Sequence, residues 1–128
     1  MRIAFAGPFG LHPNKTMGSR AMGLARSLVQ SGNQVSIFLP PWQTPQEAGR
    51  TWEEDGVSLH YSTLTGGILG ITNRLVKDIL RWDPQIVHCF KPKAYSGLVA
   101  WRLWYFHRDR MRLVVDMDDW EGYGGWND

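Results

Sequence analysis

The feature that most restricts the fold of this chain lies at its amino-terminal end, where two strand-like segments flank a loop and a helical pattern. Residues 2–6 (RIAFA) and 34–39 (QVSIFL) are short apolar runs of strand length. Between them, a loop rich in glycine and proline precedes residues 17–31, whose apolar side chains recur at helical spacing, with Thr16 and Gly32 as expected caps. A unit of about 35 residues in this order has the size of one βαβ crossover, so its two strands are expected to be parallel.

The same alternation continues along the chain. Further strands are expected over residues 57–61, 85–90 and 111–116, and further helices over residues 71–82 and 94–106. We expect residues 42–55 to form an irregular excursion and residues 63–70 a glycine-rich loop. Strands that alternate with helices predict an α/β fold, here a three-layer Rossmann-like domain with a mostly parallel sheet of about five strands.

This arrangement predicts where a ligand would bind. In the common strand order 3-2-1-4-5 the first and fourth strands are neighbours, and ligands bind beyond the carboxyl ends of those strands. Three segments then meet at one edge of the sheet, namely the loop after Ala6, the turn after Phe90 and the acidic segment after Val115.

Composition narrows the class of protein. The 128 residues fit one domain, and with 43% hydrophobic and 20% charged residues they are expected to fold. A formal net charge of +2 is too small to indicate nucleic-acid binding. Cys89 is the only cysteine, which rules out an internal disulfide and a cysteine-based zinc cluster. No signal peptide is evident and no apolar run approaches the ~20 residues of a membrane span, so we expect a cytoplasmic protein.

The first of the three segments, residues 7–20, has the composition of a phosphate-binding loop. Its glycines let backbone amides approach a phosphate, the next helix presents its amino end, and cationic side chains add charge. The candidate residues are Gly7, Gly10, Lys15, Gly18 and Arg20. The spacing is not GxGxxG and no acidic residue ends residues 34–39, which argues against an NAD-binding oxidoreductase. Alternatively, the glycines serve turn geometry alone.

The second segment is the end of the fourth expected strand and the turn after it. His88 can donate to or accept from a hydroxyl or phosphate group, and Lys91 and Lys93 suit an anionic partner. Alternatively, His88 is a hydrogen-bonded core residue and both lysines are solvated.

The third segment joins acidic and aromatic side chains at the end of the fifth expected strand. Asp116, Asp118 and Asp119 could bind sugar hydroxyls or a metal ion, and Trp120 could stack on a sugar ring. We expect no metal site, because no second acidic cluster lies near the first strand. Alternatively, Asp118 or Asp119 caps a helix and Trp120 belongs to an apolar core.

Residues 101–112 (WRLWYFHRDRMR) interleave aromatic and basic side chains. Such a segment suits a membrane interface with anionic headgroups, and Arg74, Lys77 and Arg81 could extend it. The substrate that accepts a transferred group could then be lipid-linked. Alternatively, this helix packs on the sheet with its arginines directed outward.

Four stretches, in their order and spacing, resemble the N-terminal, acceptor-side half of GT-B glycosyltransferases of the GT4-like group, the glycogen synthase and mannosyltransferase type. The stretches are residues 2–5 (RIAF) before a Gly/Pro loop, 18–21 (GSRA) opening a helix that continues with 24–28 (LARSL), 32–37 (GNQVSI), which matches that group's G-H-x-V-T-V, and 83–88 (DPQIVH), which matches its D-P-D-V-V-H. The resemblance covers nearly the whole chain. Two departures are Asn33, where the group usually has histidine, and Phe90, which replaces the second histidine of its His-x-His.

The resemblance implies a role for each candidate residue. Residues 7–20 would face the diphosphate of a nucleotide-sugar donor, which is a co-substrate, so no cofactor or metal is required. His88 and Asp118 would be catalytic. The residues that would bind the acceptor are Lys91, Lys93, Asp116, Asp119 and Trp120.

The resemblance also implies that residues 1–128 are one domain of a two-domain enzyme whose C-terminal, donor-binding domain, with its Glu-x7-Glu segment, is not in this sequence. The expected reaction is transfer of a sugar to the hydroxyl of a small or lipid-linked acceptor, in the cytoplasm or at the inner face of the membrane. The chain alone is then expected to be inactive and to need that domain as a partner, in cis or in trans. The alternative is a non-catalytic α/β binding or interaction module.

Overall fold

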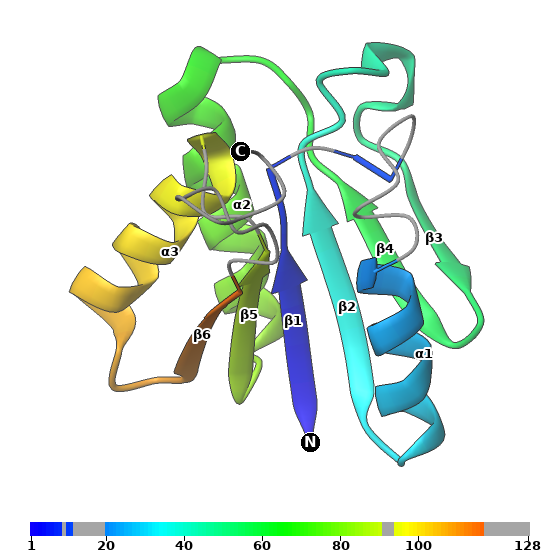
Figure 1. Cartoon of the computed structure of the whole chain (residues 1–128). Coiled ribbons are helices and arrows are strands. Elements are labelled where there is room, and N and C mark those ends of the chain that lie inside the picture. The colour runs from blue at the N-terminus through cyan, green and yellow to red at the C-terminus, as the bar shows by residue number, and fades with distance from the viewer. Residues whose placement is uncertain (9, 12–19, 91–93, 117–128) are drawn as a thin grey trace, which may run out of the picture.

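The computed structural model describes residues 1–8, 10–11, 20–90 and 94–116 and has an α/β architecture (Figure 1). The strands are β1 (Arg2–Ala6), β2 (Gln34–Leu39), β3 (Thr51–Glu54), β4 (Val57–Tyr61), β5 (Ile86–Phe90) and β6 (Arg112–Asp116). The helices are α1 (Met22–Gln30), α2 (Gly67–Trp82) and α3 (Ala94–His107), with a short 3-10 turn, η2 (Pro45–Glu47).

The six strands form one sheet in the order β3-β4-β2-β1-β5-β6. Every neighbouring pair is parallel except β3 and β4, which are antiparallel. Without β3, the order is third, second, first, fourth and fifth, so the predicted order is confirmed. The expected number of about five strands is corrected to six, because an additional strand joins the edge of the sheet.

That additional strand corrects the expectation that residues 42–55 are irregular. Residues 51–54 form β3, which pairs with β4 from Thr51 opposite His60 to Glu54 opposite Val57. Asp55 and Gly56 make the turn between the two strands and both have positive φ angles, 54° and 80°. The short strand was missed because its side chains are largely exposed, so it lacks an apolar alternation.

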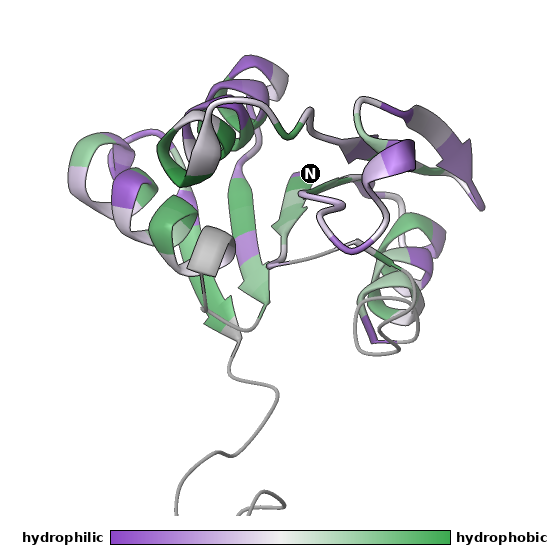
Figure 2. Cartoon of the chain, turned by 90° about the horizontal axis from the view of Figure 1, so that it is seen from above, coloured by the Kyte–Doolittle hydropathy of each residue, from purple (hydrophilic) through white to green (hydrophobic). Residues whose placement is uncertain are grey.

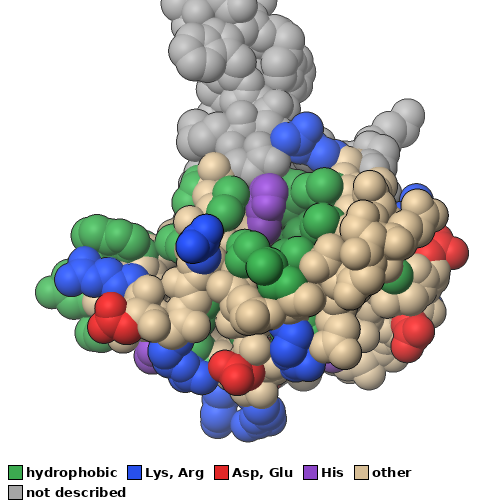
Figure 3. Space-filling view, turned by 90° about the horizontal axis from the view of Figure 1, so that it is seen from below, with side chains coloured by type: hydrophobic (Ala, Val, Ile, Leu, Met, Phe, Trp, Pro, Cys, Tyr) green, Lys and Arg blue, Asp and Glu red, His purple; other side chains and the backbone are tan. Residues whose placement is uncertain are grey.

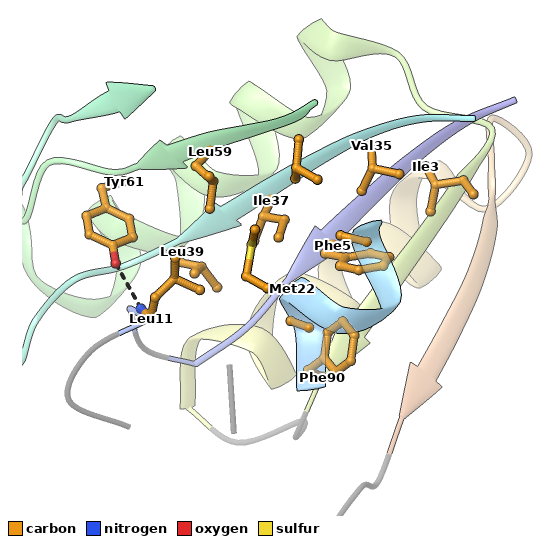
Figure 4. Packing of buried hydrophobic residues seen from close by; sticks show 13 residues of the cluster. Ile3, Phe5, Leu11, Met22, Val35, Ile37, Leu39, Leu59, Tyr61 and Phe90 are labelled. Atoms are coloured by element: carbon orange, nitrogen blue, oxygen red, sulfur yellow. Dashed lines mark hydrogen bonds between the residues drawn. The ribbon is translucent and has the colours of Figure 1, made fainter. Parts of the chain in front are cut away.

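Helices cover both faces of the sheet, which gives three layers (Figure 2). On one face, α1 packs on the central strands through Met22 and Ala25, against Phe5, Ile37 and Leu59 (Figure 4). These side chains are almost fully buried. The same core continues along the strands through Ile3, Val35, Leu39, Val57, Tyr61 and Phe90.

On the other face, α2 and α3 lie side by side and pack on the sheet. Leu75 and Ile79 of α2 and Leu103 of α3 are buried against Phe38 and Val87. The helix expected over residues 71–82 has Leu75, Ile79 and Trp82 at helical spacing, and the structure buries Leu75 and Ile79 and partly buries Trp82. These two cores, one on each face of the sheet, confirm the predicted three layers.

The predicted helices differ from the observed ones mainly at their starts. Helix α1 begins at Met22, after a turn of π-helix at Arg20 and Ala21, and the predicted cap Thr16 lies outside the described residues. Helix α2 begins at Gly67, inside the expected loop of residues 63–70. Its first turn has Ile68 and Leu69 exposed, so no buried stripe marks this turn in the sequence. Gly32, with φ of 93°, follows the last turn of α1 as expected.

Within residues 1–8, 10–11, 20–90 and 94–116, no helix combines the length and apolar character needed to cross a membrane.

Candidate functional site at the carboxyl edge of the sheet

The carboxyl ends of β1, β5 and β6 meet at one edge of the sheet, as predicted. Ala6, the last residue of β1, pairs with Cys89, and Phe90, the last residue of β5, pairs with Asp116, the last residue of β6. We call this part of the sheet the carboxyl edge. The three segments with candidate site residues therefore leave the sheet from neighbouring positions.

The described part of the chain contains only some of the candidate residues. Gly7, Gly10, Arg20 and His88 are described, together with the backbone of Asp116. The predictions for the other candidates lie outside the described residues, and these are Lys15, Gly18, Lys91, Lys93, Asp118, Asp119 and Trp120. What the structure defines is the support from which their segments start.

The loop after β1 is held by two side chains from distant parts of the sequence, Tyr61 at the end of β4 and Trp42 after β2. The backbone N–H of Leu11 donates a buried hydrogen bond of 2.8 Å to the Tyr61 hydroxyl at the end of β4 (Figure 4). The indole Nε1–H of Trp42 donates to the Pro8 carbonyl oxygen at 2.9 Å. Neither Tyr61 nor Trp42 was predicted to position this loop. The alternation of residues 57–61 predicted the strand that carries Tyr61, but not the contact of its hydroxyl.

Gly10 has a packing reason to be glycine. A Cβ atom at this position would lie 3.0 Å from the Tyr61 hydroxyl oxygen and 3.2 Å from its Cζ atom. A side chain at position 10 would therefore displace the Tyr61 ring or the loop. This contact favours the alternative that Gly10 serves loop geometry, while its approach to a phosphate stays a prediction.

Burial determines the chemical state of Tyr61. The loss of solvent raises the pKa of its phenol above the ordinary value of 10.0, and the N–H of Leu11 offsets part of this effect. Tyr61 is thus a neutral hydroxyl at physiological pH, with an oxygen that already accepts one hydrogen bond. We assign it to loop positioning and not to acid–base chemistry.

His88 lies between aromatic rings on the α1 side of the sheet. Its imidazole stacks on the Phe90 ring, with centroids 4.4 Å apart and planes 18° apart, and lies 5.4 Å from the Phe5 ring. The side chain is half-buried. On the face of the molecule seen from below, hydrophobic side chains lie exposed beside Lys and Arg side chains (Figure 3). These ring contacts fix the plane of the His88 imidazole. A catalytic role for His88 stays a prediction.

The sheet beside His88 is open on this side. His88 pairs with Val114 of β6, so the two side chains point to the same face, and Val114 is 40% exposed. Helix α1 packs mainly on the central strands and reaches β5 at Phe90, whereas Val114 of β6 is partly exposed. A molecule at the carboxyl edge could therefore reach His88 over Val114.

The carboxyl edge is also anchored to α3. The hydroxyl of Ser96 in the first turn of α3 donates to the Phe90 carbonyl oxygen at 2.8 Å, and Ser96 is fully buried. This bond fixes the start of α3 to the last residue of β5. Serine at the start of a helix was available as a signal, because it commonly bonds nearby backbone, but it was not used.

The described residues hold neither a group of metal ligands nor a reactive thiol. In the part of the chain that the structure describes, no three His, Cys, Asp or Glu side chains gather as metal ligands would. Cys89 is fully buried, which raises the pKa of its thiol to about 12. Such a thiol is protonated and inert at physiological pH.

Comparison of the sequence with models of protein families and with curated proteins gives no match. A function can therefore be argued only from the geometry of the carboxyl edge and from the motifs of the sequence itself.

Proposed function

We propose that this chain is the acceptor-side domain of a glycosyltransferase of the GT-B type, which moves a sugar from a nucleotide-sugar to an acceptor hydroxyl. In this proposal the sheet is one half of a GT-B fold, and the donor-binding half is a second domain. Residues 7–20 face the donor diphosphate, and His88 with Asp118 acts at the reacting hydroxyl. Donor phosphates are neutralised by cationic side chains and helix amino ends, so no metal ion is needed.

The strand order is the observation that carries this proposal. The order β4-β2-β1-β5-β6 brings the ends of β1, β5 and β6 together, and these are the strands that precede the three candidate segments. Ligands bind at such a point in open α/β sheets. The open sheet face beside His88 and Val114 adds room for an acceptor. Fold alone does not define a function, so the motif resemblance supplies the reaction type.

The test is a reconstitution assay with a labelled nucleotide-sugar and a panel of hydroxyl acceptors. The chain alone should give no transfer, and transfer should appear when a donor-binding GT-B domain is fused after residue 128. In the active fusion, His88→Gln and Asp118→Asn should each lower kcat by roughly 100-fold or more, the usual size of a lost general acid or base.

Asp55→Asn is the matched control for Asp118→Asn. Asp55 lies in the β3–β4 turn at φ 54°, a conformation that asparagine tolerates, and its side chain is exposed. Its replacement should leave kcat unchanged. Full activity of both site variants, or no transfer by any fusion while the chain is folded, would contradict the proposal. The non-catalytic α/β module would then be the better description.

A second function, contact with a membrane surface, is favoured by the outer face of α3. The side chains of Trp101, Trp104, Tyr105 and Phe106 are each at least half exposed, at 53%, 50%, 58% and 60%. We call them the α3 aromatic patch. The guanidinium of Arg108 lies 5.2 Å from the Trp104 ring centroid, so positive charge borders the patch. Amphipathic aromatic rings with adjacent arginines suit the interface of a bilayer with anionic headgroups.

The packing of α3 agrees in part with the alternative reading of this segment. Val99 and Leu103 are buried against the sheet, as that alternative expected, but the aromatic side chains are outside. Arg74 and Arg81 do not extend the patch, because both line a cleft beside β4. Lys77 is exposed on α2 and does not line that cleft, so it stays a candidate for the basic part of the contact, together with Arg108 beside the patch.

Co-sedimentation with vesicles tests the membrane contact. Binding should require phosphatidylserine in phosphatidylcholine vesicles and weaken with salt. Arg108→Glu changes the charge by two, so at about 1 kcal/mol per charge it should lower the partition constant roughly 30-fold. Arg50→Glu is the matched control, since Arg50 also lies over a tryptophan, 4.1 Å from the Trp52 ring, but on β3's side of the sheet. Equal binding by wild type and Arg108→Glu would contradict the contact.

A further inference from the structure

A second cleft lies on the α2 side of the sheet, next to β4. Parallel neighbours are usually joined by a helix that covers the sheet, as α1 joins β1 to β2 and α3 joins β5 to β6. The connection from β2 to β4 instead contains only η2 and the edge strand β3 (Figure 1). Helix α1 packs on the other face of β4, and on the α2 side a cleft of about 470 Å³ is lined by β4, α2 and neighbouring residues.

The lining of this cleft contains several polar side chains, which come from strands and a helix. We call it the β4 cleft, and its polar lining includes Thr51 of β3, His60 of β4, Ser62 and Thr63 directly after β4, and Arg74, Asp78 and Arg81 of α2. The strand β4 alternates between its faces. Val57, Leu59 and Tyr61 are buried in the core under α1, while the residues between them face α2. Polar side chains are thus built into the wall of the cleft.

Two buried polar atoms in this wall lack hydrogen-bond partners. They are the Ser62 hydroxyl oxygen and the His60 Nε2 atom, neither of which is bonded within the described ranges. Ser62 is only 6% exposed. A buried polar group without a partner costs about 1–3 kcal/mol, so a ligand that supplied partners to these two atoms would recover that energy.

His60 is held in a fixed position and is uncharged. Its ring stacks on Phe38, with centroids 4.8 Å apart and planes only 9° apart. Burial lowers the pKa of His60, and this effect outweighs the opposing charge of Asp78. At physiological pH the imidazole therefore offers one acceptor and one donor nitrogen.

The α2 wall adds charged groups of both signs. Asp78 and Arg81 lie on the side of α2 that faces β4, and no hydrogen bond or ion pair engages Arg81 among the residues described. Arg74 donates to the Thr63 and Thr65 carbonyl oxygens at 2.9 and 2.6 Å, so it closes one end of the cleft. Arginine suits a phosphate or carboxylate, and a carboxylate with hydroxyl and imidazole groups suits ligand hydroxyls.

We propose that the β4 cleft is a second binding site, for a small molecule that carries several hydroxyl groups and one anionic group. The anionic group is bound at Arg81, and the hydroxyls bond to Ser62, His60 and Asp78. The volume is within the range of small-molecule sites and accommodates a ligand the size of a sugar phosphate. This site uses none of the residues assigned to the carboxyl edge, so it does not depend on the proposed transferase function.

Two-dimensional ¹H–¹⁵N NMR titration of the chain tests the proposal. The probes are glucose 6-phosphate and ribose 5-phosphate, with glucose and inorganic phosphate as the two halves of the ligand. At least one sugar phosphate should shift the amides of His60, Ser62 and Thr63 at probe concentrations up to the order of 10 mM, the range of a weak site. Each half alone should bind at least roughly tenfold more weakly than that probe, since it makes only part of the contacts.

Variants locate the site. Arg81→Gln should weaken binding roughly tenfold or more, because it removes a charge-assisted hydrogen bond. Ser62→Ala should weaken binding by a smaller factor. Lys77→Gln is the matched control, because Lys77 is an exposed cation of α2 that does not line the cleft, and it should change affinity less than about twofold.

Three results would overturn the proposal. The first is the absence of shifts at these amides with both sugar phosphates while the spectrum remains that of a folded protein. The second is equal affinity for inorganic phosphate and for the sugar phosphates, which would mean that hydroxyl recognition is absent. The third is equal weakening by Arg81→Gln and Lys77→Gln, which would indicate a general charge effect and no built site.

Discussion

The carboxyl edge and the β4 cleft differ in the part of the chain that supplies their polar groups. At the carboxyl edge the candidate groups are carried mainly by segments that follow β1, β5 and β6. At the β4 cleft they are carried by the strand ends and by α2 itself. The first kind of site depends on strand order, and the second depends on the placement of α2 beside β4.

The two regions also differ in how their backbone is supported. The carboxyl edge rests on fully buried side chains, among them Phe5 and Phe90, and on the hydrogen bonds from Leu11 and Ser96. The β4 cleft contains buried polar atoms without partners in the described chain, at Ser62 and His60. Replacements at the edge should therefore lower stability, whereas replacements in the cleft should cost little.

The largest expected effect is at the carboxyl edge. Phe90→Ala should lower the free energy of unfolding by about 3–5 kcal/mol, because Phe90 is fully buried and contacts the rings of Phe5 and His88. Thr63→Ala, at an exposed position in the β4 cleft, should change it by less than about 0.5 kcal/mol. Urea unfolding followed by circular dichroism measures both. Similar losses in the two variants would remove the distinction between the regions.

A smaller loss is expected from the hydroxyl that holds the first loop. Tyr61→Phe leaves the buried Leu11 N–H without its acceptor and should cost about 1–3 kcal/mol. Tyr105→Phe is the matched control, since Tyr105 is 58% exposed, and should be close to neutral. If the two variants are equally stable in urea, the Tyr61 hydroxyl does not anchor the loop.

Two serines provide a direct comparison of the regions. Ser96→Ala removes the bond to the Phe90 carbonyl oxygen and should lower the free energy of unfolding by about 1 kcal/mol. Ser62→Ala removes a buried hydroxyl that has no partner among the described residues, so it should be neutral or slightly stabilising. A loss at Ser62 as large as that at Ser96 would show that the Ser62 hydroxyl is bonded, and the cleft would then lose one of its free groups.

Strand order and the apolar cores could be predicted from the sequence for a physical reason. Buried strands such as residues 2–6 and 34–39 are apolar because both faces of a parallel sheet are covered, and their spacing leaves room for one helix. The meeting of the ends of β1, β5 and β6 followed from that order alone. The roles of Lys15, Lys91 and Asp118 stay predictions, since these residues lie outside the described chain.

The features that sequence reasoning missed depend on contacts between distant segments. The Tyr61 hydroxyl meets the Leu11 N–H across 50 residues, and no local pattern signals that bond. The strand β3 has few buried side chains, so its pairing with β4 leaves no periodicity to detect. The β4 cleft was missed for the same reason, because its walls come from β3, β4 and α2, which no local pattern of the sequence brings together.

The smallest expected effect concerns His60 and pH. Burial keeps the pKa of His60 in the folded chain below the 6.5 of an unfolded chain. As the pH falls below about 6.5, the unfolded chain binds a proton here before the folded chain does, so stability is lost until the pH reaches the lower folded pKa. Above that pH range His60 is neutral in both the folded and the unfolded chain, so it no longer contributes to the pH dependence of stability. Wild type should therefore lose more free energy of unfolding than His60→Gln between about pH 7.5 and about pH 5, as measured by urea unfolding at each pH.

The other histidines are common to both proteins, so the difference isolates His60. Identical pH dependence would mean that solvent reaches the imidazole freely, and the uncharged wall on which the β4 cleft depends would not exist.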